Sequence, residues 1–134
     1  CANDNAGGLN SMLKLMIVDD SNIIRRKIQR ECDSGHFTVV ATATNGVDAL
    51  RKFDESKPQV ITMDLTMPHM DGIECVEKII ARDPSVRILV VSALADINTG
   101  IEALEKGARG FLCKPFNEVK LTDALKQLTE GLNV

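Results

Sequence analysis

The sequence predicts an α/β fold in which five parallel strands alternate with five helices that cover both faces of the sheet. Short apolar runs alternate with stretches of helical periodicity along the chain. The runs at residues 14–18 and 59–64 are largely apolar at successive positions, which is typical of strands buried on both faces. A carboxylate closes each run, and because an unpaired charge inside a buried strand costs several kcal/mol, it belongs at the strand end.

Composition indicates one globular domain. The chain has 134 residues, of which 44% are hydrophobic and 26% charged, enough for a real core. A net charge of −3 and the lack of Trp and Tyr argue against nucleic acid and anionic membranes as partners. Four separated cysteines without a CxxC pair argue against zinc or a disulfide framework and favour the cytoplasm. No stretch reaches the length of a transmembrane helix.

The domain is expected to span residues 12–134. Residues 1–11 hold little apolar content and two adjacent glycines, so we expect a flexible leader or a cloning remnant there. After the first strand at 14–18, Ser21 or Asn22 can cap a helix that has apolar residues on one face.

The next two strands differ in character. Residues 38–44 mix valine and alanine with threonine, which suits an edge strand. An Asn-Gly pair follows, and Val47, Leu50 and Phe53 then recur at helical spacing. The strand at 59–64 comes next and is expected to be central.

The third helix is predicted to begin near Gly72. Asp71 can cap it, and Pro84 ends it before a continuous apolar strand at 86–91.

The fourth helix is predicted to be weak. Its apolar stripe consists only of Ile97, Ile101 and Leu104 and is interrupted by Gly100, while Gly107 suits its C-terminal end.

The last strand is short, spans residues 110–113, and is followed by Lys114 and a proline. The final helix carries leucines spaced three or four residues apart, at Leu121, Leu125, Leu128 and Leu132.

Strand character predicts the sheet order. The first, third and fourth strands are the most continuously apolar and should be central, with the second and fifth at the edges. This fits the doubly wound, flavodoxin-like order 2-1-3-4-5, whose crevice opens between the carboxyl ends of strands one and three.

Four strands end in polar residues that this fold brings to one crevice: Asp19 with Asp20, Asp64, Ser92 and Lys114. Crowded carboxylates repel one another by about 4 kcal/mol per pair at roughly 4 Å, so they need a cation. Oxygen ligands with room for water favour Mg²⁺. With a metal and Lys114 nearby, Asp64 is placed to attack phosphorus and form an acyl phosphate.

Residues 12–134 resemble the receiver domains of two-component response regulators, particularly the single-domain chemotaxis type. The matching motifs are Val18-Asp19-Asp20, Asp64 with Met67-Pro68 and Asp71-Gly72, Ser92-Ala93, and Lys114-Pro115-Phe116.

The resemblance implies a phosphorylation-activated signalling switch. Asp64 would accept phosphate from a histidine kinase. Asp20, Asp64 and the Thr66 backbone carbonyl would ligate Mg²⁺, with Asp19 acting through water. Ser92 and Lys114 would bind the phosphoryl oxygens, and the peptide bond that follows Lys114 would be cis.

We also expect an output surface on the fourth helix, fifth strand and fifth helix, which would bind a downstream protein. A phosphoryl group on Asp64 would draw Ser92 inward, Phe111 would rotate into the vacated space, and the weak fourth helix would move. Phe111 stands at the aromatic switch position, where the best-known chemotaxis members have Tyr, and Ser92 stands where many members have Thr. Phe111 can exchange buried and exposed rotamers but cannot donate a hydrogen bond, so a flagellar-motor partner does not follow from the resemblance.

Other interpretations stay open. The chain can be a stand-alone regulator, monomeric or weakly dimeric, or a receiver cut from a larger, for example DNA-binding, regulator. A haloacid-dehalogenase-type phosphatase would need a second Asp where Thr66 stands, so turnover of outside substrates is not expected. A flavodoxin-like cofactor binder would need a phosphate-cradling loop, which the sequence lacks.

The basic run Arg25-Arg26-Lys27 is interpreted as a solvated helix face, with kinase docking as the alternative.

Overall fold

The computed structural model describes residues 12–32, 36–65, 72–93 and 96–132. Five strands in these ranges form one parallel sheet in the order β2-β1-β3-β4-β5, which confirms the predicted order and both edge strands. The strands are β1 (Leu13–Val18), β2 (Phe37–Ala43), β3 (Val60–Asp64), β4 (Arg87–Ala93) and β5 (Gly110–Lys114).

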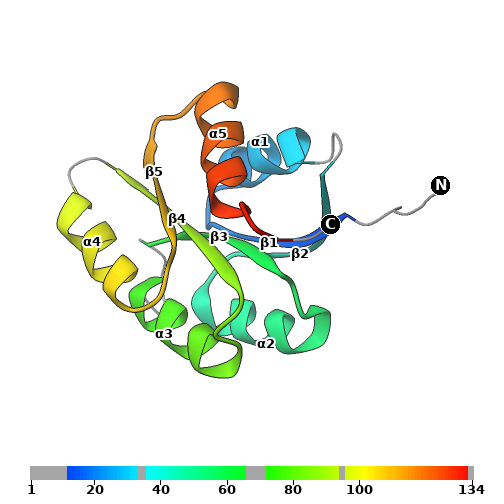
Figure 1. Cartoon of the computed structure of the whole chain (residues 1–134), viewed down its shortest axis with the longest axis vertical. Helices are drawn as coiled ribbons and strands as arrows, with labels where there is room; N and C mark the ends of the chain where they lie inside the picture. Colours follow the sequence, from blue (N-terminus) through cyan, green and yellow to red (C-terminus); the bar gives the residue numbers. More distant parts are fainter. Residues whose placement is uncertain (1–11, 33–35, 66–71, 94–95, 133–134) are drawn as a thin grey trace.

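A helix follows each strand, and the helices form two outer layers (Figure 1). Two of them cover one face of the sheet and three cover the other, as right-handed crossovers between parallel strands require. The first layer contains α1 (Asn22–Cys32) and α5 (Glu118–Leu128), and the second contains α2 (Gly46–Ser56), α3 (Gly72–Arg82) and α4 (Ile97–Glu105).

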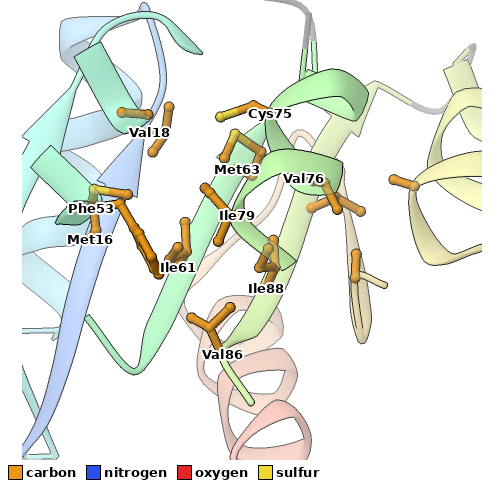
Figure 2. Packing of buried hydrophobic residues seen from close by; sticks show 14 of the residues in the cluster. Met16, Val18, Phe53, Ile61, Met63, Cys75, Val76, Ile79, Val86 and Ile88 are labelled. Atoms are coloured by element: carbon orange, nitrogen blue, oxygen red, sulfur yellow. The ribbon is translucent and has the colours of Figure 1, made fainter. Parts of the chain in front are cut away.

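The sheet divides the core into two apolar clusters. Successive strand residues point to opposite faces, so Met16 and Ile61 join the cluster under α2, α3 and α4, while Leu15 and Val60 join the one under α1 and α5. Figure 2 shows the first cluster, where side chains of β1, β3 and β4 meet those of α3. Each fully buried aliphatic side chain contributes about 1.5–3 kcal/mol of transfer free energy, which fixes the strand register and hence the strand ends.

The fourth helix packs differently from the prediction. Ile97, Ile101 and Leu104 are 45%, 51% and 40% exposed, so the predicted apolar stripe faces outward. Gly100 and Ala103 are the buried residues of α4. A Cβ atom on Gly100 would lie 1.8 Å from Cε2 of Phe111, so the glycine provides the space that the phenylalanine ring occupies. Gly100 therefore has a packing role that the sequence pattern did not reveal.

Two smaller predictions are also wrong. Val47 of α2 is 58% exposed, because the buried face of this helix is formed by Gly46, Ala49 and Phe53. Helix α5 ends at Leu128, so Leu132 packs against the core from beyond the helix. The predicted cap Asp71 lies outside the described residues.

Candidate functional site

Three aspartates meet where β1 and β3 end. Asp19 and Asp20 follow β1, Asp64 closes β3, and one carboxylate oxygen of each lies within 4.8 Å of the others. Asp19 and Asp64 are 1% and 2% exposed, whereas Asp20 is exposed. Strands β1 and β3 are the neighbours at which the strand order reverses direction across the sheet. The aspartates therefore lie at the strand ends where this order predicts a crevice.

Local hydrogen bonds orient Asp19. Its Oδ1 accepts the backbone N–H of Ser21 at 2.9 Å, and its carbonyl oxygen accepts Nη1 of Arg25 at 2.7 Å. Ser21 Oγ accepts the N–H of Ile24 at 3.3 Å, so Ser21 is the residue that caps α1. The second carboxylate oxygen, Oδ2, faces Lys114 instead.

Lys114 brings a positive charge to the same crevice. Its Nζ lies 3.2 Å from Oδ2 of Asp19 and 3.6 Å from Oδ1 of Asp64, and its side chain is three-quarters buried. One ammonium group cannot neutralise three carboxylates, so the cluster keeps an excess of negative charge. The Lys114–Pro115 peptide bond is cis, which confirms the prediction.

Ser92 lies at the end of β4, on the same face of the sheet as Phe111. Val90 pairs with Phe111 and Ser92 with Cys113, and alternate residues of β4 share a face. Ser92 is 1% exposed, and its hydroxyl has no hydrogen-bond partner among the residues that the structure describes. A buried hydroxyl without a partner is costly, so this one is available to a group that enters the crevice.

The interpretation of Arg25-Arg26-Lys27 as a solvated face is wrong for two of the three residues. Arg26 is exposed, but Arg25 and Lys27 are half-buried. Arg25 donates to the carbonyl of Asp19, and Lys27 Nζ donates to the carbonyl of Phe116. A run of three basic residues does not indicate which of them turn inward, so the sequence could not have identified these contacts. Thr66, the remaining predicted ligand, lies outside the described residues.

The family model for the response regulator receiver domain matches residues 15–126. The chain belongs to this family. Among relatives, the chemotaxis protein CheY of Listeria monocytogenes is 42% identical over 116 residues, which are 87% of this chain and 98% of that protein. This receiver is therefore similar to a stand-alone regulator along nearly the whole length of both chains.

The receiver also resembles part of a larger protein and a solved complex. A protein-glutamate methylesterase/protein-glutamine glutaminase of Bacillus licheniformis is 42% identical over 132 residues, covering 90% of this chain but 36% of that protein. The CheY structure from the CheX–CheY–BeF₃–Mg complex of Borrelia burgdorferi has a TM-score of 0.82 and 30% identity, covering 87% of this chain and 88% of that chain. None of the helices in the described part of the receiver is long and apolar enough to cross a membrane.

The aspartate cluster fits a divalent cation. Oδ2 of Asp19 is buried and, although it forms an ion pair with Lys114, it accepts no hydrogen bond from any residue that the structure describes. All the clustered groups are carboxylates, and oxygen is the ligand atom that Mg²⁺ prefers. Asp20 is exposed and leaves room for water in the coordination shell.

We expect Mg²⁺ to raise the melting temperature of the receiver, and to do so much less in Asp20→Asn. Metal saturated to about 100 times its dissociation constant stabilises the fold by about 2.7 kcal/mol, and removal of a ligand weakens that binding. Thermal unfolding with and without Mg²⁺ measures both proteins. Asp123→Asn, on the exposed side of α5, is the matched control and should respond like the wild type. Equal metal-induced shifts in wild type and Asp20→Asn would contradict a site at this cluster.

Proposed function

We propose that this receiver is a phosphorylation-activated signalling switch whose phosphoryl acceptor is Asp64. The observation that supports the proposal best is the meeting of Asp64 with Asp19, Asp20 and Lys114 in one crevice. These residues come from three separate strand ends, and the family to which the chain belongs gives the assembly its signalling context.

The chemistry follows from the charges. An oxygen of Asp64 attacks the phosphorus of a phosphohistidine, the new P–O bond forms as the P–N bond breaks, and the imidazole nitrogen keeps the electron pair. Asp19, Asp20, Asp64 and the backbone carbonyl of Thr66 would hold Mg²⁺, which would supply charge stabilisation for the phosphoryl oxygens. Lys114 would pair with one of those oxygens, and Ser92 would donate its hydroxyl to another.

This activity differs from that of a turnover enzyme. The receiver would take a phosphoryl group, hold it as a signal and assist its own dephosphorylation, without a separate substrate. Thr66 still stands where a haloacid-dehalogenase-type phosphatase needs its second Asp, which disfavours that alternative. A histidine kinase in the cytoplasm is the proposed donor, and residues 12–134 are the proposed functional unit, monomeric or weakly dimeric.

Output is proposed to leave through α4, β5 and α5. The exposed Ile97, Ile101 and Leu104 of α4 support this, because neighbouring apolar side chains at a surface favour contact with a protein partner. In the proposed switch, Ser92 moves toward the phosphoryl group and Phe111 follows it on the same face of the sheet. The stand-alone chemotaxis role is supported by the Listeria relative, whereas the methylesterase match supports the alternative of a receiver within a larger regulator.

Acetyl phosphate provides the test. The isolated protein should gain one phosphoryl group when Mg²⁺ is present and none when the metal is removed with EDTA, since the domain itself supplies nucleophile, metal ligands and lysine. Intact-mass spectrometry gives the stoichiometry, and peptide mapping should place the group on Asp64. A phosphoryl group on any other residue, or equal labelling in EDTA, would overturn the assignment.

A further inference from the structure

Lys27 contacts the segment that carries Lys114, although the two lysines lie far apart in the sequence. Lys27 Nζ donates a hydrogen bond to the carbonyl of Phe116 and sits 4.6 Å from the centroid of the Phe116 ring. The Phe116 ring is 5% exposed and belongs to the core cluster under α1 and α5. The ammonium group of Lys27 is therefore held by two contacts with one residue, the main-chain oxygen and the buried ring of Phe116.

The position of Lys114 depends on the segment that follows it. Among the strands that the structure describes, β5 is an edge strand paired with β4 alone, so its final residue has a neighbouring strand on one side. Beyond Lys114, the chain passes through Pro115 and Phe116 before Asn117 caps α5 by accepting the N–H of Lys120 at 2.9 Å. The contact from Lys27 links this short connection to α1.

Helix α1 thus contacts Asp19, one partner of the central ion pair, and the connection that follows Lys114, the other partner. Arg25 donates to the carbonyl of Asp19 at 2.7 Å, and Lys27, two residues later, donates to the connection after Lys114. Asp19 and Lys114 themselves are 3.2 Å apart. An error of about 1 Å in placing a reacting group can lower the rate by two orders of magnitude. Contacts from α1 that fix the positions of Asp19 and Lys114 can therefore affect the rate of phosphoryl transfer.

We propose that Lys27 is a positioning residue, which holds Lys114 over Asp64 through the carbonyl and ring of Phe116. The inference rests on the proposed phosphoryl transfer to Asp64 and adds a residue to it. Lys27 touches no reacting atom in this role, so its removal should slow the transfer and leave the metal ligands as they are.

Lys27→Met tests the proposal, because it keeps an unbranched side chain and removes the ammonium donor. With saturating Mg²⁺, we expect acetyl phosphate to phosphorylate Lys27→Met about tenfold more slowly than wild type. The dissociation constant of Mg²⁺ should stay within about twofold, since none of its ligands changes. Lys27→Arg, which keeps a cationic donor, should restore most of the rate, and Arg26→Met, an exposed neighbour, should behave like wild type.

The NMR signal of the Lys114 side chain gives a readout that a purely structural role would not move. In Lys27→Met without phosphate, the Lys114 Cε signal should shift, whereas that of the exposed Lys120 should not. An unchanged rate and an unchanged Lys114 signal in folded Lys27→Met would overturn the proposal. So would an equal rate loss in Arg26→Met, or a loss of Mg²⁺ affinity that accounts for the slower rate.

Two further outcomes are distinguishable. If wild type itself takes no phosphoryl group, the proposed function fails and the role of Lys27 in it fails too. If Lys27→Met does not fold, Lys27→Gln replaces it as the test variant, because the glutamine amide keeps a neutral hydrogen-bond donor. A wild-type phosphorylation rate in Lys27→Gln together with a slow rate in Lys27→Arg would contradict a role for the cationic donor.

Discussion

Asp64→Asn is expected to take no phosphoryl group from acetyl phosphate and to unfold at a higher temperature than the metal-free wild type. The amide oxygen is a far weaker nucleophile than the carboxylate, so transfer should fall below detection. The substitution also removes two carboxylate repulsions, toward Asp19 and Asp20, and weakens the attraction to Lys114 3.6 Å away. With an effective dielectric near 20, each such pair amounts to a few kcal/mol, and we expect a net gain on the order of 2 kcal/mol.

Two measurements check this expectation. Intact-mass spectrometry follows phosphorylation, and thermal unfolding in EDTA should show a rise of roughly 5 °C for a domain of this size. Asp123→Asn makes the same chemical change on the exposed side of α5 and should leave both quantities at their wild-type values. Wild-type phosphorylation of Asp64→Asn would exclude Asp64 as the acceptor, and a lower melting temperature would show that the carboxylates do not repel in the metal-free fold.

The strand order and the place of the site could be predicted because both depend on strong local signals. A continuous apolar strand must be buried on both faces, and a charge must then lie at its end. This reasoning predicts Asp19, Asp20 and Asp64 at neighbouring strand ends, and the structure places their carboxylates together.

Helix α4 could not be predicted in the same way. Its isoleucines and leucine have helical spacing, which normally identifies a buried face. Here the face that packs is formed by small residues, Gly100 and Ala103, because the ring of Phe111 fills the space above the helix backbone. A tertiary contact with a residue of β5 decides which face is buried, and no local pattern in residues 97–105 records that contact.

The contacts of Arg25 and Lys27 were missed for a related reason. Both side chains reach backbone carbonyl oxygens, and a carbonyl oxygen is present at every residue, so it leaves no mark in the sequence. Long, flexible basic side chains also bury their stems and turn their charged ends toward whatever acceptor is near. Only the packing of α1 against β1 and α5 determines that these acceptors belong to Asp19 and Phe116.

Gly72, the first residue of α3, lies close to the backbone at the end of β3. A Cβ atom there would lie 2.5 Å from Cα of Leu65 and 2.7 Å from the carbonyl oxygen of Asp64. The backbone N–H of Gly72 also donates to the carbonyl of Leu65 at 3.2 Å. The first turn of α3 therefore rests directly on the main chain at Asp64 and Leu65. The two nearest atoms that a side chain would strike belong to the backbone, and the third is Cδ2 of Leu65 at 2.9 Å.

Gly72→Ala is expected to destabilise the receiver by about 3 kcal/mol, or roughly 10 °C in melting temperature. Alanine gains up to about 1 kcal/mol in helix propensity, but a clash with backbone can be relieved only by moving α3 away from the end of β3. Gly100→Ala is the comparison, since its added methyl group meets the Phe111 ring, a side chain that can rotate aside, and it should lose less. Thermal unfolding ranks the two variants, and a Gly72→Ala protein as stable as wild type would show that the start of α3 is free to shift without disturbing Asp64.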